Sequence, residues 1–192
     1  NINCQVFIEN DVVIGDNVVI REYVTVNKGP EAAMKTVVGN NTLLMAYVHI
    51  AHDCIIGNNC VLANNANLAG HVEVGDYTIL GGSTNFQQFV KIGRHVIVSG
   101  GCLVNKDIPP FVRAARHPTT YAGVNSIGLR RRGYSTEQIN QILDVYRILY
   151  IRGYNTSTAI KYIDADIESS ADKDEIVNFI RESVRGIMKG FK

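Results

Sequence analysis

An apolar residue recurs at every sixth position through the first hundred residues of this 192-residue chain. The recurring residues are Ile2, Ile8, Ile14, Ile20 and Val26, then Val38, Leu44, Ile50, Ile56, Leu62, Leu68, Val74, Leu80, Phe86, Ile92, Val98 and Val104. A period of six fits neither an amphipathic helix nor a long alternating strand. It predicts a short flat strand followed by a corner, and three such units close a triangular coil of 18 residues.

Residues that accept sharp corners recur between these apolar positions. The predicted corners contain the pairs Asn40-Asn41, Asn58-Asn59 and Asn64-Asn65, and also Asp76. Asn, Asp and Gly tolerate the left-handed backbone conformation that a sharp corner needs. Coils stacked about 4.8 Å apart would bury the apolar positions in one column. We therefore expect an all-β solenoid, a parallel β-helix, over residues 1–110, with a loop near residues 28–36.

The six-residue period stops near Pro109-Pro110, and a helical period follows after a connector. Ser135 and Gln138 have the spacing of a helix capping box, and apolar residues on one helical face then continue to about Gly153. Further helices are predicted at residues 156–163 and 172–188. Residues 111–192 should thus form a connector and a C-terminal α-helical domain. This helical domain would cover the open end of the solenoid, whose strand edge must be blocked.

Composition excludes several classes of function. The formal net charge is +1, so the chain lacks the global basic field of a nucleic-acid-binding protein. It has no run of about 18 apolar residues, so we expect no integral membrane segment. No signal peptide follows Asn1, and no CxxC pair occurs, which favours a cytoplasmic protein with free thiols. The four cysteines are Cys4, Cys54, Cys60 and Cys102.

The repeat register predicts a cluster of polar residues at one corner. Equivalent positions stack on adjacent coils, so His52 stacks with Gly70 and then with Gln88. Asp53 follows His52, and His71 follows Gly70. The two histidines should therefore project from neighbouring coils at the same edge of the solenoid.

These residue types suit general base catalysis. A neutral histidine can remove a proton from a sugar hydroxyl as that hydroxyl attacks a thioester. An acidic neighbour such as Asp53 can hold the histidine tautomer, and a glycine N–H can approach a developing oxyanion. The gathering of His49, His52 and His71 with Asp53 favours a site over ordinary polar corners, whereas we interpret His95 as an ordinary corner residue.

Two alternatives remain at this point. Three histidines on adjacent coils can also bind zinc, as in some β-helical carbonic anhydrases. No sequence spacing rule supports a zinc site here, so we predict no metal. The other alternative is a solenoid that serves as a scaffold without catalytic activity.

Several blocks of sequence carry a more specific signal than the histidines. They are residues 43–45, 49–54, 62–66, 68–72, 88–89, 107–110, 123–125 and 128–135. These blocks resemble the hexapeptide-repeat acyltransferases, and in particular the acyl-(acyl-carrier-protein)–UDP-N-acetylglucosamine O-acyltransferases of lipid A synthesis. The resemblance covers nearly the whole chain. It implies a left-handed β-helix, whereas the general crossover rule alone would predict a right-handed one.

The resemblance implies roles for the matching residues. His52 matches the general base, Asp53 its orienting acid, and Gly70 the backbone oxyanion donor. Five further residues match substrate-contacting positions: His49, His71 and Gln88 at the sugar and its acyl group, and Asn125 and Arg131 at the nucleotide end, reached from a neighbouring subunit.

The resemblance also implies a reaction and its partners. A homotrimer would transfer a 3-hydroxyacyl chain from acyl carrier protein to the 3-hydroxyl of UDP-N-acetylglucosamine, the first step of lipid A biosynthesis. No metal or diffusible cofactor is implied, since the donor carries its own phosphopantetheine. The run 130–132 could contact phosphates, and four other arginines could extend a basic surface for the acidic carrier: Arg113, Arg116, Arg147 and Arg152.

Other enzymes of the class remain alternatives. One is the related UDP-3-O-acyl-glucosamine N-acyltransferase, and another is a sugar or antibiotic acetyltransferase that uses acetyl-CoA. Residues 128–135 favour the O-acyltransferase. That family has further coils and a substrate-holding Asp/Lys loop upstream, so we expect more sequence before Asn1; a naturally shortened protein is the alternative.

Overall fold

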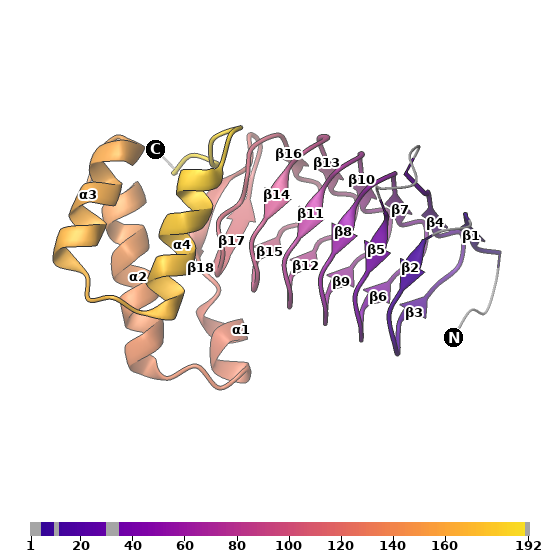
Figure 1. The fold of residues 1–192 in the computed structure, drawn as a ribbon, viewed down its shortest axis with the longest axis horizontal. Helices are drawn as coiled ribbons and strands as arrows, with labels where there is room; N and C mark the ends of the chain where they lie inside the picture. The colour runs from indigo at the N-terminus through magenta and orange to yellow at the C-terminus, as the bar shows by residue number, and fades with distance from the viewer. Residues whose placement is uncertain (1–4, 10–11, 30–34, 191–192) are drawn as a thin grey trace.

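The computed structural model describes residues 5–9, 12–29 and 35–190. Within them, three parallel sheets built of two-residue strands wind into a solenoid (Figure 1). The first sheet contains β1 (Phe7–Ile8), β4 (Thr25–Val26), β7 (His49–Ile50), β10 (Asn67–Leu68), β13 (Asn85–Phe86) and β16 (Leu103–Val104). The second contains β2 (Val13–Ile14), β5 (Val37–Val38), β8 (Ile55–Ile56), β11 (Glu73–Val74) and β14 (Lys91–Ile92). The predicted β-solenoid is confirmed.

The third sheet is the longest, because a hairpin extends it beyond the repeats. It contains β3 (Val19–Ile20), β6 (Leu43–Leu44), β9 (Val61–Leu62), β12 (Ile79–Leu80), β15 (Ile97–Val98), β17 (Val112–Ala115) and β18 (Thr120–Val124). Strand β17 pairs parallel to β15, and β18 then pairs antiparallel to β17. The repeat pattern gave no indication of this hairpin, which lies in the segment that we predicted as a connector.

The strands pair in the register that the repeat predicts. Asn67 pairs with Asn85, the equivalent position one coil further along the chain. The coil that includes β4 and β5 differs, because Thr25 pairs with His49 and the chain between them is one repeat unit longer. The extra unit lies between β4 and β5, in the segment predicted as a loop. Residues 30–34 of that segment lie outside the described residues.

Burial follows the repeat closely. The second residue of each strand from β3 to β16 is buried, which confirms the predicted apolar column over those coils. Cys54, Cys60 and Cys102 are buried and free, as predicted, while Cys4 lies outside the described residues. Buried aliphatic side chains of this size each contribute about 1.5–3 kcal/mol, so the column is the main source of solenoid stability.

The corners adopt left-handed backbone conformations, as predicted for Asn41, Asn59 and Asn65. Aromatic and ionisable residues occupy equivalent corners: Tyr23, Tyr47, Asp53, His71, Tyr77, Phe89 and His95. A left-handed conformation costs a non-glycine residue about 1–3 kcal/mol, so the stacked coils on either side must hold these corners in place. The geometry of the coil thus overrides the intrinsic backbone preference of these residues.

Four helices follow the hairpin in the described part of the chain: α1 (Ser126–Arg131), α2 (Thr136–Tyr150), α3 (Thr156–Asp166) and α4 (Ala171–Glu182). The capping box at Ser135 and Gln138 is confirmed. Figure 1 shows the helices gathered beyond the hairpin at one end of the solenoid. The edge of the third sheet is therefore covered first by the hairpin, and α2 packs on β18. No helix among the described residues combines the length and apolar character that crossing a membrane requires.

The prediction of a helix over residues 172–188 is wrong at its end, because α4 stops at Glu182. Gly186 adopts a φ of +73°, which a continuing helix cannot contain. The chain then runs extended, and the Met188 N–H donates to the Asp107 carbonyl. A side-chain contact adds to this docking, since the Ser183 hydroxyl lies 2.6 Å from Asp107 Oδ2. The terminal segment therefore packs beside the last coil instead of extending the helix.

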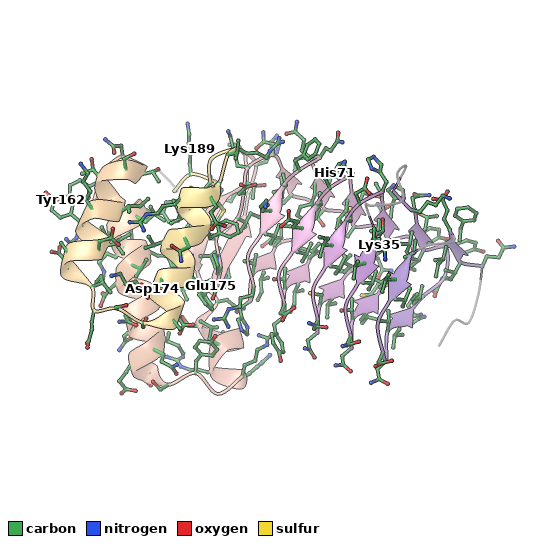
Figure 2. All side chains as sticks on the ribbon, viewed as in Figure 1. Lys35, His71, Tyr162, Asp174, Glu175 and Lys189 are labelled. Atoms are coloured by element: carbon green, nitrogen blue, oxygen red, sulfur yellow. The ribbon has the colours of Figure 1, made fainter. Side chains whose placement is uncertain are left out.

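Arg94 joins the solenoid to the helices. Its guanidinium lies 2.9 Å from Asp172 Oδ1 and 2.6 Å from Glu175 Oε2, both on α4. It also donates to the Tyr134 hydroxyl at 2.8 Å. Figure 2 shows Glu175 on α4. These charge-assisted hydrogen bonds fix α4 relative to the last coils.

Candidate active site

His52 and Asp53 lie at the corner between the first and second sheets, directly after β7. His52 Nδ1 is 2.8 Å from Asp53 Oδ2. The Asp53 side chain is only 4% exposed, whereas that of His52 is 41% exposed. The Asp53 N–H donates to the Thr36 hydroxyl at 2.9 Å, which anchors the corner. A carboxylate accepts a hydrogen bond from Nδ1–H, so the lone pair of the imidazole resides on the exposed Nε2.

The His52 ring lies over Gly70 on the next coil. A Cβ added at Gly70 would be 2.5 Å from His52 Cε1 and 2.6 Å from its Nε2. No side chain fits there, so glycine is required for the ring to occupy this position. The Gly70 N–H makes no hydrogen bond to any described residue. A backbone donor thus remains unused on the residue that the His52 ring covers.

His71 completes the cluster from the same coil as Gly70. Its Nε2 is 3.6 Å from Asp53 Oδ2, and its ring meets the His52 ring edge-on with centroids 5.1 Å apart. Figure 2 shows His71 on the edge of the solenoid, midway along its length. The structure therefore brings His52, Asp53 and His71 together at one edge, where the repeat register places them.

Phe89 is a neighbour of the site that the sequence analysis did not assign. Its ring stacks on the His71 imidazole with centroids 4.6 Å apart and an interplanar angle of 13°. Asp53, His71 and Phe89 occupy the same corner position on three successive coils. The repeat position that Phe89 shares with His71 was the signal that could have identified it.

His49 lies apart from the other histidines. It is on β7, and its Nδ1 is 2.7 Å from the Thr25 hydroxyl. Burial lowers the pKa of His49, so the ring is neutral at pH 7. No hydrogen bond, ion pair or ring contact in the described part of the chain joins it to His52 or Asp53. Its side chain faces outward from the first sheet, next to the corner and not within the cluster.

Gln88 is exposed on the coil beyond Gly70. Its carbonyl oxygen accepts a hydrogen bond from Arg185 Nη1 at 2.8 Å. Arg185 belongs to the segment that follows α4, so the terminal segment reaches the corner column of the site. The sequence analysis placed Arg185 inside the helix predicted over residues 172–188 and did not predict its hydrogen bond to Gln88.

Asn125 and Arg131 lie on the side of the molecule that the third sheet forms. Asn125 is buried, and its side chain accepts from the Gly128 N–H at 3.2 Å and donates to the His95 carbonyl at 2.9 Å. It therefore caps α1 and ties that helix to the solenoid. Arg131, in the last turn of α1, is exposed.

Arg131 lines a cavity of about 710 Å³ between α1 and the third sheet. Two further arginines, Arg113 and Arg132, line the same cavity, and the strands contribute Ile79 and Ile97 to its wall. A cavity with guanidinium groups around an apolar wall suits a phosphorylated ligand with a flat base. Within one chain, this cavity and the His52 corner belong to different faces of the solenoid.

The outer surface of the third sheet is apolar along its length. The outward residue of each repeat strand is Val19, Leu43, Val61, Ile79 or Ile97. The inward residues of the same strands fill the core, so this sheet is apolar on both sides. A continuous apolar stripe on an exposed surface is typical of a protein interface.

His95 differs from the ordinary polar corner that we predicted. It is buried and stacks between Tyr77 and Phe111, with ring centroids 4.9 Å and 5.8 Å away. Burial, together with the nearby charges of Arg94 and Arg132, lowers the pKa of His95 to about 4. Its Nδ1 is buried and makes no hydrogen bond in the described structure. His95 is thus a neutral member of an aromatic column beneath α1.

Comparison with known proteins supports one family over the length of the chain. Residues 35–70 match the bacterial transferase hexapeptide profile, and residues 107–188 match domain 2 of the UDP-N-acetylglucosamine O-acyltransferases. A curated acyl-(acyl-carrier-protein)–UDP-N-acetylglucosamine O-acyltransferase of Chlorobaculum parvum is 58% identical over 182 residues, which cover 93% of this chain and 68% of that protein. The corresponding protein of Aquifex aeolicus is 54% identical over 185 residues, covering 96% and 71%.

Solved structures agree with the sequence matches. The UDP-N-acetylglucosamine acyltransferase of Bacteroides fragilis superimposes with a TM-score of 0.90 at 47% identity, covering 93% of this chain and 70% of that one. The Francisella novicida enzyme gives a TM-score of 0.87 at 39% identity, covering 93% and 66%. These matches include both the solenoid and the helical region. The chain therefore belongs to the acyl-(acyl-carrier-protein)–UDP-N-acetylglucosamine O-acyltransferase family.

Proposed function

We propose that this chain catalyses its family's reaction with His52 as the general base. The reaction transfers a 3-hydroxyacyl chain from acyl carrier protein to the 3-hydroxyl of UDP-N-acetylglucosamine, which opens lipid A biosynthesis. The observation that carries the proposal is the hydrogen bond between His52 Nδ1 and Asp53 Oδ2, because it leaves Nε2 as the exposed acceptor. The resident residues suffice for this chemistry, so the mechanism invokes no metal and no diffusible cofactor.

The steps follow from the positions of these groups. His52 Nε2 takes the proton of the 3-hydroxyl as that oxygen bonds to the thioester carbon, and Asp53 stabilises the imidazolium that forms. The negative charge moves to the thioester oxygen, where the unpaired Gly70 N–H donates to it. The intermediate collapses by breaking the carbon–sulfur bond, and His52 returns the proton to the phosphopantetheine sulfur. The ester product and the free thiol of the carrier complete the balance.

The remaining site residues are assigned to substrate contact. His71 stands beside the base and would contact the sugar or its acyl group, with His49 and Gln88 along the same edge. Arg131 lines the cavity beside the third sheet and would bind the nucleotide phosphates. Asn125 is committed to the start of α1, so its contribution would be to hold that helix in place.

A homotrimer would reunite these two parts of the site. The His52 corner and the Arg131 cavity belong to different faces of one chain, so a substrate that spans both needs a neighbouring copy. The apolar outer surface of the third sheet supplies a surface for such packing. Light scattering should give three times the chain mass of 21.2 kDa. An active monomer would contradict this part of the proposal.

The donor and the compartment follow from the same assignment. We propose acyl carrier protein as the donor and the cytoplasm as the location, where the buried free thiols would stay reduced. Of the arginines suggested for a carrier surface, Arg147 pairs with Asp144, and Arg152 lies 3.9 Å from Asp166. Arg113 lines the cavity beside Arg131. The basic surface for a carrier is therefore smaller than the sequence suggested.

Replacement of the base provides the direct test. His52→Ala should lower kcat by about 10²- to 10⁴-fold, measured as acyl transfer from a carrier-protein thioester to UDP-N-acetylglucosamine. His117→Ala is the matched control, because His117 is exposed beyond the repeats. Circular dichroism checks that both variants fold. Turnover near that of the parent chain in folded His52→Ala would remove His52 from the base role.

Substrate comparisons separate the related activities. A UDP-3-O-acyl-glucosamine acceptor, which has a free 2-amino group and no free 3-hydroxyl, should not react with this chain. An N-acyltransferase would use it. Acyl-CoA should be a poor donor beside the carrier-protein thioester. Preference for acetyl-CoA would instead favour a sugar acetyltransferase.

A further inference from the structure

The His52 corner gathers more ligand atoms than a general base requires. One ring nitrogen of each histidine and one carboxylate oxygen of Asp53 lie within 4.8 Å of one another. Asp53 Oδ2 faces both histidines, at 2.8 Å and 3.6 Å. The other carboxylate oxygen, Oδ1, is buried and has no hydrogen-bond partner among the described residues. A buried carboxylate with an unsatisfied oxygen is costly, and a bound cation is one way to satisfy it.

We propose that His52, Asp53 and His71 form a binding site for a divalent transition-metal ion of the zinc type, and that its occupation inhibits acyl transfer. The inhibitory part rests on the proposed role of His52 as the base. An ion on His52 Nδ1 would replace the proton that His52 shares with Asp53. The neutral imidazole then carries its proton on Nε2, which has no lone pair left to accept the proton of the acceptor hydroxyl.

The ligand set determines the class of metal. Two imidazoles and one carboxylate are typical ligands of zinc, whereas magnesium prefers an octahedron of oxygen ligands. Zinc–nitrogen and zinc–oxygen bonds are about 2.0–2.2 Å long, so ligand atoms on one tetrahedral ion lie roughly 3.3–3.6 Å apart. The 3.6 Å between Asp53 Oδ2 and His71 Nε2 lies at the edge of this range, whereas the 2.8 Å between Asp53 Oδ2 and His52 Nδ1 would have to widen on binding. His52 is 41% exposed and His71 is 23% exposed, so an ion can reach the corner from solvent.

Other ligands in the described chain do not compete for the ion. Cys54 follows Asp53, but its side chain is buried and its Sγ lies 3.2 Å from the Ala69 carbonyl oxygen, turned into the core. Cys60 is also buried, with its Sγ 3.3 Å from the Gly75 carbonyl oxygen. His49 is engaged with Thr25. The cluster is therefore the place where one ion should bind.

Calorimetric titration of the full chain with zinc chloride tests the site without relying on catalysis. The protein is first treated with chelator, the buffer does not bind metal, and Cys4→Ser is present in every sample to remove that thiol as an alternative ligand. We expect one zinc ion per chain and no binding of magnesium. His71→Gln should weaken zinc binding by more than about tenfold, since even outer ligands contribute that much. His117→Gln should bind zinc like the parent chain.

Activity provides the second readout. Zinc added to the parent chain should inhibit acyl transfer, and chelator should restore it fully. Absence of zinc binding up to millimolar concentration, or equal binding by His71→Gln, would overturn the metal site and leave the proposed function intact. Stoichiometric binding by a chain that shows no acyl transfer even when it is free of zinc would instead contradict the proposed function while supporting the site. Stoichiometric binding with undiminished acyl transfer would overturn the inhibitory role.

Discussion

His52 and Gly70 occupy the same repeat position on adjacent coils, and an added Cβ at Gly70 would lie 2.5 Å from His52 Cε1. The imidazole therefore occupies the space that any side chain at position 70 would take. This contact links the position of the proposed base to the identity of a residue on the next coil. The proposed oxyanion donor and the proposed base are thus positioned by the same pair of coils.

Gly70→Ala should displace the His52 ring and break its alignment with Asp53. Because a shift of about 1 Å in a catalytic group can cost about a hundredfold, we expect kcat to fall by about that factor. Gly82→Ala is the matched control, since a Cβ there meets only the Asn64 carbonyl oxygen at 3.3 Å. Steady-state kinetics of both folded variants measure this difference in kcat. Equal turnover in the two variants would show that the ring does not need this position.

Asp53→Asn should lower kcat by about 10²-fold or more, because the amide can turn its N–H₂ group towards Nδ1 and favour the wrong imidazole tautomer. The double variant with His52→Ala separates this role from a general effect on folding. If Asp53 acts through His52, the double variant should be no slower than His52→Ala alone. Multiplicative losses would mean that the two residues act independently.

Phe89→Leu should impair substrate contact at His71, because stacking of the two rings orders the imidazole. An aromatic pair contributes about 0.5–1.5 kcal/mol, which corresponds to a change of about two- to twelvefold in kcat/KM. Phe89→Tyr keeps the stacking ring and should stay close to the parent enzyme. Equal kinetics of the leucine and tyrosine variants would deny Phe89 a positioning role.

Arg131→Ala should raise KM for UDP-N-acetylglucosamine by about tenfold or more, since a hydrogen bond to a charged group contributes about 1.5–3 kcal/mol. Arg130 provides the control, because it precedes Arg131 on α1 and does not line the cavity. Arg130→Ala should change KM by less than about twofold. A similar rise in both variants would indicate a general effect of charge.

The pKa of His95 makes stability depend on pH in a defined window. Because burial lowers that pKa to about 4, the folded chain binds fewer protons than the unfolded chain between about pH 4 and pH 6.5. The free energy of unfolding should therefore decrease as pH falls through this window, by on the order of 3 kcal/mol in total. Urea denaturation at pH 7 and pH 4 measures this change. His95→Phe keeps the aromatic column and should reduce the difference, whereas an undiminished difference would assign it to other groups.

The sequence was sufficient to predict the solenoid because one physical requirement repeats there. Each inward residue such as Ile50 or Leu68 must be apolar, and each repeat unit has the same length of six residues. The register that follows from this repeat also located His52, Gly70 and His71 at one edge. Where one repeat unit was added before β5, the period itself was unchanged, so the prediction still held.

The remaining features depend on contacts that have no period. Hairpin β17–β18 forms because the last coil offers an open sheet edge, which a local pattern does not encode. The resemblance implies that Asn125 contacts the nucleotide end of the substrate, but it gives no indication that the side chain also donates to the carbonyl of His95 on an earlier coil. Helix α4 ends at Glu182, and the chain beyond it docks on the last coil, where the Asp107 carbonyl accepts the Met188 N–H. Such partners are known only once distant segments have been brought together.

Asp53, His71 and Phe89 have φ values of +60°, +61° and +66°. Glycine would adopt this conformation without the steric cost that a Cβ brings. Substituting glycine at these corners would relax the backbone and at the same time remove a carboxylate, an imidazole or its stacking partner. Thermal stability and turnover therefore place opposite demands on these three corners. Selection for thermostable variants would remove side chains that the proposed catalysis uses.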